Sequence, residues 1–178
     1  GQPDFKSNAP NAGTGDPRIP SAKTLRGPQG VWIQYGKLYV ADTQNHRVLV
    51  WNSIPTSNFQ PADLVLGQSN FATAIEPDLT KVAVDAKPTT LLNPVSVTSD
   101  GQRLYVTDLG HNRVLIWNSL PTQNQQPADV AIGQPDLNSA LAGTESAKKL
   151  CPSNGKDDQG NDTYPGRCTA TLDFPRFA

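Results

Sequence analysis

The chain of 178 residues contains no methionine, and charged side chains make up only 17% of it. Its net charge of −1 provides no excess of basic residues that could neutralise nucleic-acid phosphates or anionic lipid headgroups. It also lacks a run of about 18 apolar residues, the length that a membrane-spanning helix needs. These absences argue against nucleic acid as a partner and against insertion into a membrane.

Histidine and cysteine are scarce, which restricts metal sites. A zinc site needs about three protein ligands, and His46 and His111 lie in corresponding loops without an obvious third donor. We therefore interpret both histidines as solvated loop residues. Cys151 and Cys168 bracket a polar stretch and fit no metal-binding spacing.

We predict that Cys151 and Cys168 form a disulfide, because no other cysteine competes and the stretch between them is too polar to order itself by burial. The closed loop would contribute about 3 kcal/mol by the chain-entropy estimate. A disulfide in turn predicts an oxidising location, extracellular or in the cell envelope. Two free thiols in a cytosolic protein are the alternative.

The chain does contain an internal repeat. Residues 37–56 recur as residues 103–122, with Leu, Tyr, Val, Asp, Arg, Val, Leu, Trp, Asn, Ser, Pro and Thr in the same order. Chance does not produce such a match, whereas a duplicated structural unit does. The offset divides one domain into a first repeat with a long leading loop, a second repeat, and the start of a third that holds the cysteines, over residues 1–66, 67–132 and 133–178.

Each repeat predicts four short strands. A hairpin is expected from Lys37–Asp42 and Arg47–Asn52, and its second strand is apolar at odd and even positions alike, so it must be covered on both faces. Further strands are expected before and after the two hairpins, at residues 30–33, 62–66, 95–98 and 128–132. Four antiparallel strands per repeat, stacked face to face, predict an all-β fold of β-propeller blades, here two complete blades with flanking partial repeats.

The pattern Leu-Tyr-Val-x-Asp-x-x-x-x-Arg-Val, preceded by Pro28 or Pro94 and an apolar strand, resembles the NHL repeat in the long form of bacterial secreted and envelope proteins. The resemblance implies a propeller whose hairpin loops and long connections emerge on one face. Such loops either carry recognition or cover the blade edges, and we weigh the two equally. Because a closed propeller needs about four to eight blades, we expect an internal part of a longer polypeptide.

Acidic and basic residues flank each hairpin loop, as Asp42 with Arg47 and Asp108 with Arg113. We predict that each couple forms a charge-assisted pair that fixes the loop, rather than a catalytic site. Aromatic residues at matching strand positions are expected to pack in the blade cores: Trp51, Trp117, Tyr39 and Tyr105. The loop residues expected to face a ligand are Gln44, Asn45, His46, His111 and Asn112.

An acidic run in the third repeat offers oxygen ligands for calcium from Asp157, Asp158 and Asp162. It lacks the complete EF-hand pattern with its distal glutamate, so turn formation is the preferred interpretation and no cofactor is assigned.

For function we expect a non-enzymatic binding or scaffolding module of a secreted or envelope NHL-type propeller, with a protein, glycan or matrix partner or with copies of itself. One alternative is a metal-dependent lyase or hydrolase whose site is completed by other blades. Another is a structural subunit of an extracellular surface layer or filament.

Overall fold

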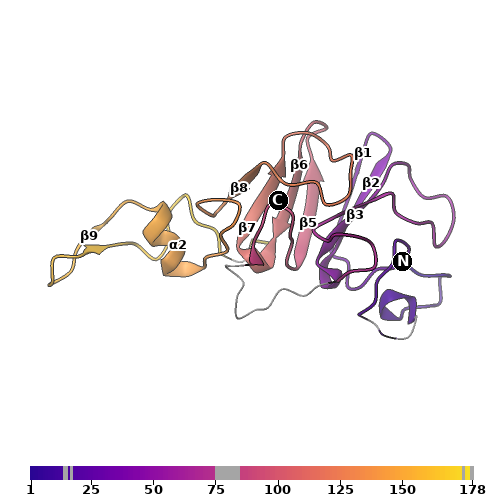
Figure 1. Ribbon diagram of the computed structural model, residues 1–178, viewed down its shortest axis with the longest axis horizontal. Coiled ribbons are helices and arrows are strands. Elements are labelled where there is room, and N and C mark those ends of the chain that lie inside the picture. The colour runs from indigo at the N-terminus through magenta and orange to yellow at the C-terminus, as the bar shows by residue number, and fades with distance from the viewer. Residues whose placement is uncertain (14–15, 17, 75–84, 174, 177–178) are drawn as a thin grey trace.

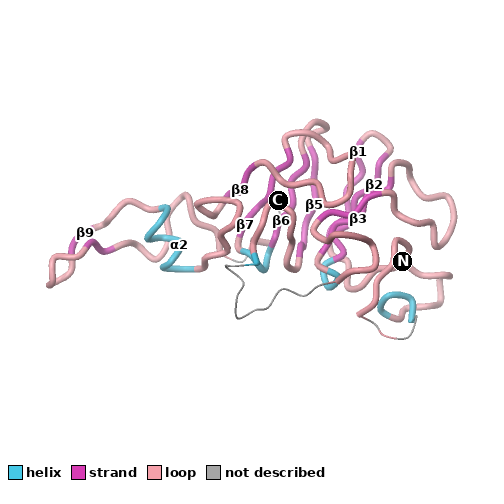
Figure 2. Tube along the Cα trace, viewed as in Figure 1, coloured by secondary structure: helices cyan, strands magenta, loops and turns pink. Residues whose placement is uncertain are grey.

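The computed structural model describes residues 1–13, 16, 18–74, 85–173 and 175–176. Its centre consists of two four-stranded antiparallel sheets that lie side by side (Figure 1, Figure 2). We call them the first sheet, with strand order β1-β2-β3-β4, and the second sheet, with order β5-β6-β7-β8. The strands are β1 (Gly30–Gln34), β2 (Lys37–Asp42), β3 (Arg47–Trp51), β4 (Leu64–Leu66), β5 (Pro94–Ser99), β6 (Leu104–Asp108), β7 (Arg113–Trp117) and β8 (Val130–Ile132).

The two sheets repeat one another in register. In both hairpins the aspartate that ends the first strand lies opposite the arginine that begins the second, as Asp42 with Arg47 and Asp108 with Arg113. The predicted antiparallel strand order of each repeat is therefore confirmed. The outer strands β4 and β8 span only three residues each, fewer than the sequence pattern predicts.

A hydrophobic core fills the seam between the two sheets. Gly30 lets the inner strands β1 and β5 approach, because a Cβ at this position would lie 2.8 Å from the Cα of Ser96. Full burial of a large apolar side chain stabilises a fold by about 1.5–3 kcal/mol, so the seam holds the sheets together. Its members from the first sheet are Tyr39, Ala41, Val48, Val50, Leu64 and Leu66, and those from the second sheet are Val97, Leu104, Val106, Leu115 and Trp117.

The first sheet also buries apolar side chains on its other face. Val40, Leu49 and Trp51 form a second cluster there, against which Leu25 and Phe71 pack from the connecting segments. The apolar strand β3 is therefore covered on both faces, as its sequence predicts.

The two strand tryptophans are both buried and make the same hydrogen bond. Trp51 is 4% exposed and Trp117 is 1% exposed. Each indole N–H donates to a backbone carbonyl nine residues further on, Gln60 at 3.1 Å and Gln126 at 2.9 Å. The prediction that both tryptophans are packing residues is confirmed.

Tyr39 is fully buried in the seam, but Tyr105 is only half-buried. The prediction that Tyr105 is a core residue is therefore wrong in this structure. Tyr105 occupies the corresponding place on the far face of the second sheet, and the described part of the chain forms no third four-stranded sheet to cover it. Its hydroxyl group donates instead to the exposed carboxylate of Asp100 at 2.8 Å.

The third repeat forms an arm that extends away from the sheets (Figure 1). It contains the helix α2 (Gly143–Leu150) and the two-stranded hairpin of β9 (Gly155–Lys156) and β10 (Asp162–Thr163). The predicted disulfide is present, with the Cα atoms of Cys151 and Cys168 5.9 Å apart. The short helix is a feature that the sequence pattern did not predict.

Candidate functional site

Each hairpin loop encloses a buried ion pair. Arg47 Nε donates to Asp42 Oδ2 at 2.8 Å, and Arg113 Nε donates to Asp108 Oδ2 at 2.9 Å. All four side chains are fully buried. The predicted pairing is confirmed, and it offsets the large cost of removing these charges from water.

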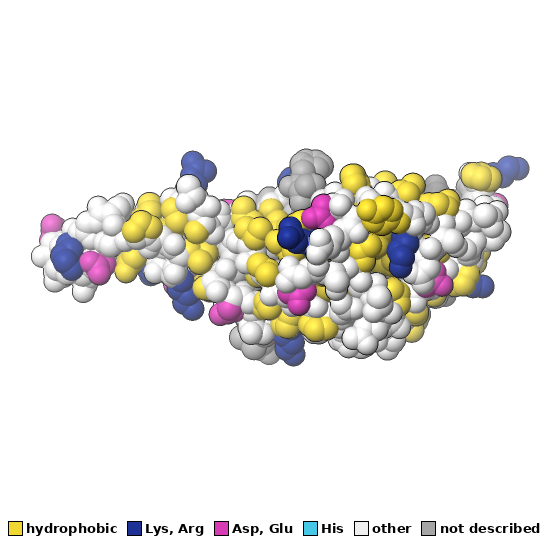
Figure 3. All heavy atoms as spheres, turned by 90° about the horizontal axis from the view of Figure 1, so that it is seen from above, with side chains coloured by type: hydrophobic (Ala, Val, Ile, Leu, Met, Phe, Trp, Pro, Cys, Tyr) yellow, Lys and Arg dark blue, Asp and Glu magenta, His cyan; other side chains and the backbone are white. Residues whose placement is uncertain are grey.

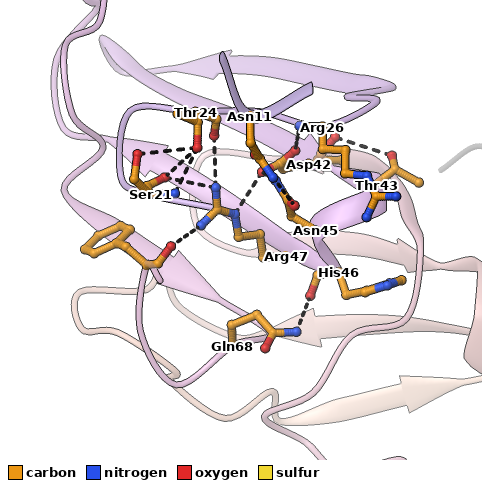
Figure 4. Close-up of polar contacts among 12 residues, drawn as sticks. Asn11, Ser21, Thr24, Arg26, Asp42, Thr43, Asn45, His46, Arg47 and Gln68 are labelled. Carbon is orange, nitrogen blue, oxygen red and sulfur yellow. Dashed lines mark hydrogen bonds and ion pairs between the residues drawn. The ribbon is translucent and has the colours of Figure 1, made fainter. Parts of the chain in front are cut away.

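The arginines use their remaining N–H groups to hold the long connections. Arg47 Nη1 donates to the Phe71 carbonyl at 2.7 Å, and Nη2 donates to the carbonyls of Ser21 at 3.0 Å and Thr24 at 2.9 Å (Figure 4). The planar fork thus joins the segment that precedes the first sheet to the segment that follows it. Arg113 makes the same three bonds one repeat later, to Leu137, Lys87 and Thr90.

The second carboxylate oxygen of each aspartate is occupied as well. Asp42 Oδ1 accepts the backbone N–H of Arg26, and Asp108 Oδ1 accepts that of Leu92, both at 2.7 Å. Burial raises the pKa of Asp108, but the charges of His111 and Arg113 and the Leu92 N–H outweigh it and hold that pKa below its ordinary value. Asp108 therefore carries a negative charge at neutral pH.

The loops themselves are 3-10 turns, η2 (Thr43–Asn45) and η4 (Leu109–His111), and each is followed by a residue in the left-handed conformation. His46 and Asn112 take this position with φ of 53° in both cases. His46 Nδ1 accepts the backbone N–H of Asn93 at 3.1 Å and so links the two sheets.

The other histidine occupies a different place, next to the ion pair. His111 Nδ1 lies 2.8 Å from Asp108 Oδ2, and its buried Nε2 has no hydrogen-bond partner among the residues that the structure describes. In the first sheet Asn45 fills this place and donates to Asp42 at 2.8 Å. Asn45 also exchanges two amide hydrogen bonds with Asn11, at 3.1 and 2.9 Å, from the turn η1 (Pro10–Gly13).

The prediction that both histidines are solvated is wrong, because His46 is 5% exposed and His111 is fully buried. The long connections fold over the loops and remove them from water. For the same reason Gln44 alone among the five residues expected to face a ligand is exposed. The buried ones are Asn45, His46, His111 and Asn112.

The calcium candidate is not assembled. No group of three or more His, Cys, Asp or Glu side chains within the described ranges is placed to hold a metal ion. Asp157 instead accepts the backbone N–H groups of Gln159 and Asn161, at 2.9 and 2.8 Å, and Asp162 pairs with Lys156 at 3.0 Å. These carboxylates stabilise the turn of the β9–β10 hairpin, as the preferred interpretation of the sequence expects.

A pocket of about 440 Å³ opens on the outer face of the first sheet. Its walls include the apolar side chains of Leu38, Val40 and Trp51, and its rim includes Asp4. The Asp4 carboxylate accepts the backbone N–H groups of Lys6 and Ser7, which lowers its pKa. Among the described residues that line the pocket, Asp4 has the only ionisable side chain, so the pocket offers mainly an apolar contact surface. Figure 3 shows hydrophobic side chains between scattered charges on the face that it displays.

Comparison with known proteins adds no assignment to this geometry. No protein-family model matches the chain, and no curated protein matches it. The arguments about function that follow therefore start from the contacts described above.

Proposed function

We propose that this chain is a non-enzymatic binding or scaffolding module of an NHL-type β-propeller, in which the two sheets are consecutive blades. The observation that carries the proposal is the polar cluster that occurs twice with the same bonds. In both copies the aspartate and the arginine are buried and bonded to the protein itself. Groups held in this way cannot reach a substrate, which favours a scaffold over a catalyst.

The clusters also support a presenting role for the loops. Each arginine fork fixes three carbonyl groups of the long connections beside the hairpin loop. Long loops that a rigid scaffold holds in place are frequent recognition surfaces. The partner we propose is a protein, a glycan or an extracellular matrix component that contacts this loop-bearing end.

A secreted or envelope location belongs to the same proposal. The Cys151–Cys168 disulfide is compatible with an extracellular location. Across the described residues, no helix has the length and apolarity needed to cross a membrane.

A panel of immobilised glycans and purified matrix proteins, probed with the whole chain, tests the proposal. We expect Gln44→Arg, at the exposed tip of the first hairpin loop, to raise the Kd for a retained ligand at least fivefold. Lys37→Glu is the matched control, because Lys37 begins β2 at the end opposite the loop. A panel that retains nothing, or equal effects of the two substitutions, would contradict the proposed loop-end site.

A further inference from the structure

The seam joins two different faces of a sheet. The first sheet contributes what we call its trailing face, and the second sheet contributes its leading face. Because the sequence repeats every 66 residues, each sheet carries both kinds of face. The leading face of the first sheet bears Leu38, Val40, Leu49 and Trp51, and the trailing face of the second sheet bears Tyr105, Ile116, Val130 and Ile132.

The trailing face of the second sheet is open where that of the first is covered. Leu64 and Leu66 are 9% and 0% exposed in the seam, whereas their counterparts Val130 and Ile132 are 41% and 49% exposed. The sequence positions are equivalent, so the difference comes from the neighbouring sheet that covers the first pair.

The leading face of the first sheet is exposed only in part. Val31 and Ile33 on β1 are 65% and 58% exposed, whereas Val40, Leu49 and Trp51 are buried in the cluster against which Leu25 and Phe71 pack. The pocket of about 440 Å³ is lined by Leu38, Val40 and Trp51. Their counterparts in the second sheet are buried in the seam against the trailing face of the first: Leu104, Val106 and Trp117. The pocket therefore lies where a trailing face would pack.

Two hydrogen bonds of the Val65 backbone fix the outer edge of the seam. The N–H of Val65, in β4, donates to Asn124 Oδ1 at 3.0 Å. The carbonyl of Val65 accepts the N–H of Gln125 at 2.8 Å. The loop between β7 and β8 thus clasps the edge strand of the preceding sheet.

The edge strand and the loop that make this contact both have counterparts elsewhere in the chain, at the trailing face of the second sheet and the leading face of the first. Ala131 in β8 has the register position of Val65 in β4. Asn58 and Phe59 are the counterparts of the clasping loop, and Phe59 already has a left-handed φ of 61°, close to the 54° of Gln125. The loop of the first sheet has the conformation of a seam contact.

We propose that the trailing face of the second sheet binds the leading face of the first sheet in a second copy of this chain, head to tail. The seam favours a second copy as the partner. The leading face that the second copy presents has the same sequence pattern and register as the leading face that is already bound in the seam within one chain. Head-to-tail contacts between unlike faces build rings or filaments. The inference concerns these 178 residues by themselves, since a further blade in a longer polypeptide would cover the same two faces. It rests on the seam and not on the binding function proposed above.

Docking requires the displacement of two segments. Residues 1–5 of the incoming copy are the repeat counterparts of residues 133–137 of the first copy, so the two segments would compete for the same site in the contact. Leu172 packs on Gly133, and its repeat counterpart in the incoming copy is Leu25. We therefore expect Leu172→Ser to strengthen the association severalfold, because it weakens the segment that competes within the chain.

A cysteine pair tests the contact directly. Phe59→Cys with Ala131→Cys should give a ladder of disulfide-linked multimers that grows with protein concentration. The matched control is Val65→Cys with Gln125→Cys, which places the pair across the seam of one chain and should give a cross-linked monomer. The proposal fails if the control cross-links and the test pair remains monomeric.

Light scattering during size-exclusion chromatography provides the second readout. The chain should elute with a mass above 19.1 kDa, and Ile132→Asp, with an unchanged circular dichroism spectrum, should return it to the monomer mass. A monomer at every concentration, or an oligomer that Ile132→Asp does not affect, would overturn the head-to-tail contact.

Discussion

Replacing Asp108 by asparagine tests how much the buried ion pair contributes to stability. The substitution keeps the shape and one oxygen, which can still accept the Leu92 N–H, but removes the charge that faces His111 and Arg113. Hydrogen bonds to charged groups are worth about 1.5–3 kcal/mol each. Breaking a buried pair costs about 3–5 kcal/mol, because the remaining charge is left uncompensated. We therefore expect the free energy of unfolding to fall by about 3–5 kcal/mol. The bonds of Arg113 to three carbonyl groups remain and prevent a larger loss.

Urea unfolding followed by tryptophan fluorescence measures this loss, since Trp117 lies in the seam beside the same hairpin. Asp129→Asn is the matched control. Asp129 accepts one backbone N–H, from Asn118 at 2.7 Å, in an exposed setting, so its replacement should cost less than about 1 kcal/mol. A loss for Asp108→Asn no larger than that of the control would refute the view that the ion pair anchors the loop.

Three further predictions use the same unfolding assay. Stability should fall as the pH drops below about 4, because the lowered pKa of Asp108 gives stability that is present above its unfolded value of 3.8 and lost as the carboxylate is protonated; Asp108→Asn should lack this component. His111→Asn should be neutral or stabilising, because asparagine can donate to Asp108 as Asn45 donates to Asp42, and the substitution removes a buried ring nitrogen that has no partner in the described part of the chain. Asn45→His should destabilise by about 1–3 kcal/mol through loss of a bonded amide; equal effects of the two would contradict the roles assigned to these positions. Replacing Cys151 and Cys168 by serine should leave the urea midpoint of the sheets nearly unchanged but make the arm sensitive to protease, and a collapse of the sheets would show that the arm supports the seam.

Local pattern was sufficient to predict the hairpins. The two-sided apolarity of the strand that ends at Trp51 or Trp117 specifies its need for cover on both faces, and the short polar loop before it specifies the preceding strand as its partner. The pairing of Asp42 with Arg47 followed from their positions on facing strands. These features are decided within about 20 residues of chain.

The burial of the loops could not be predicted in the same way. Whether His46 and His111 meet water depends on connections that return from more than 20 residues away, such as the segment that brings Asn11 to Asn45. The repeat offset does contain one usable signal. It aligns His111 with Asn45 and not with His46, so the two histidines occupy different positions of the repeat.

The arm of the third repeat has a consequence for how such a chain can change. None of the seam residues comes from the loop that the disulfide closes, and the arm leaves the sheets to one side (Figure 1). Its sequence can therefore vary in length and composition without disturbing strand register, provided that Cys151 and Cys168 still meet. The loop is a place where new segments can be inserted at little cost to folding, and a foreign peptide placed between the two cysteines would be displayed on a scaffold that does not depend on it.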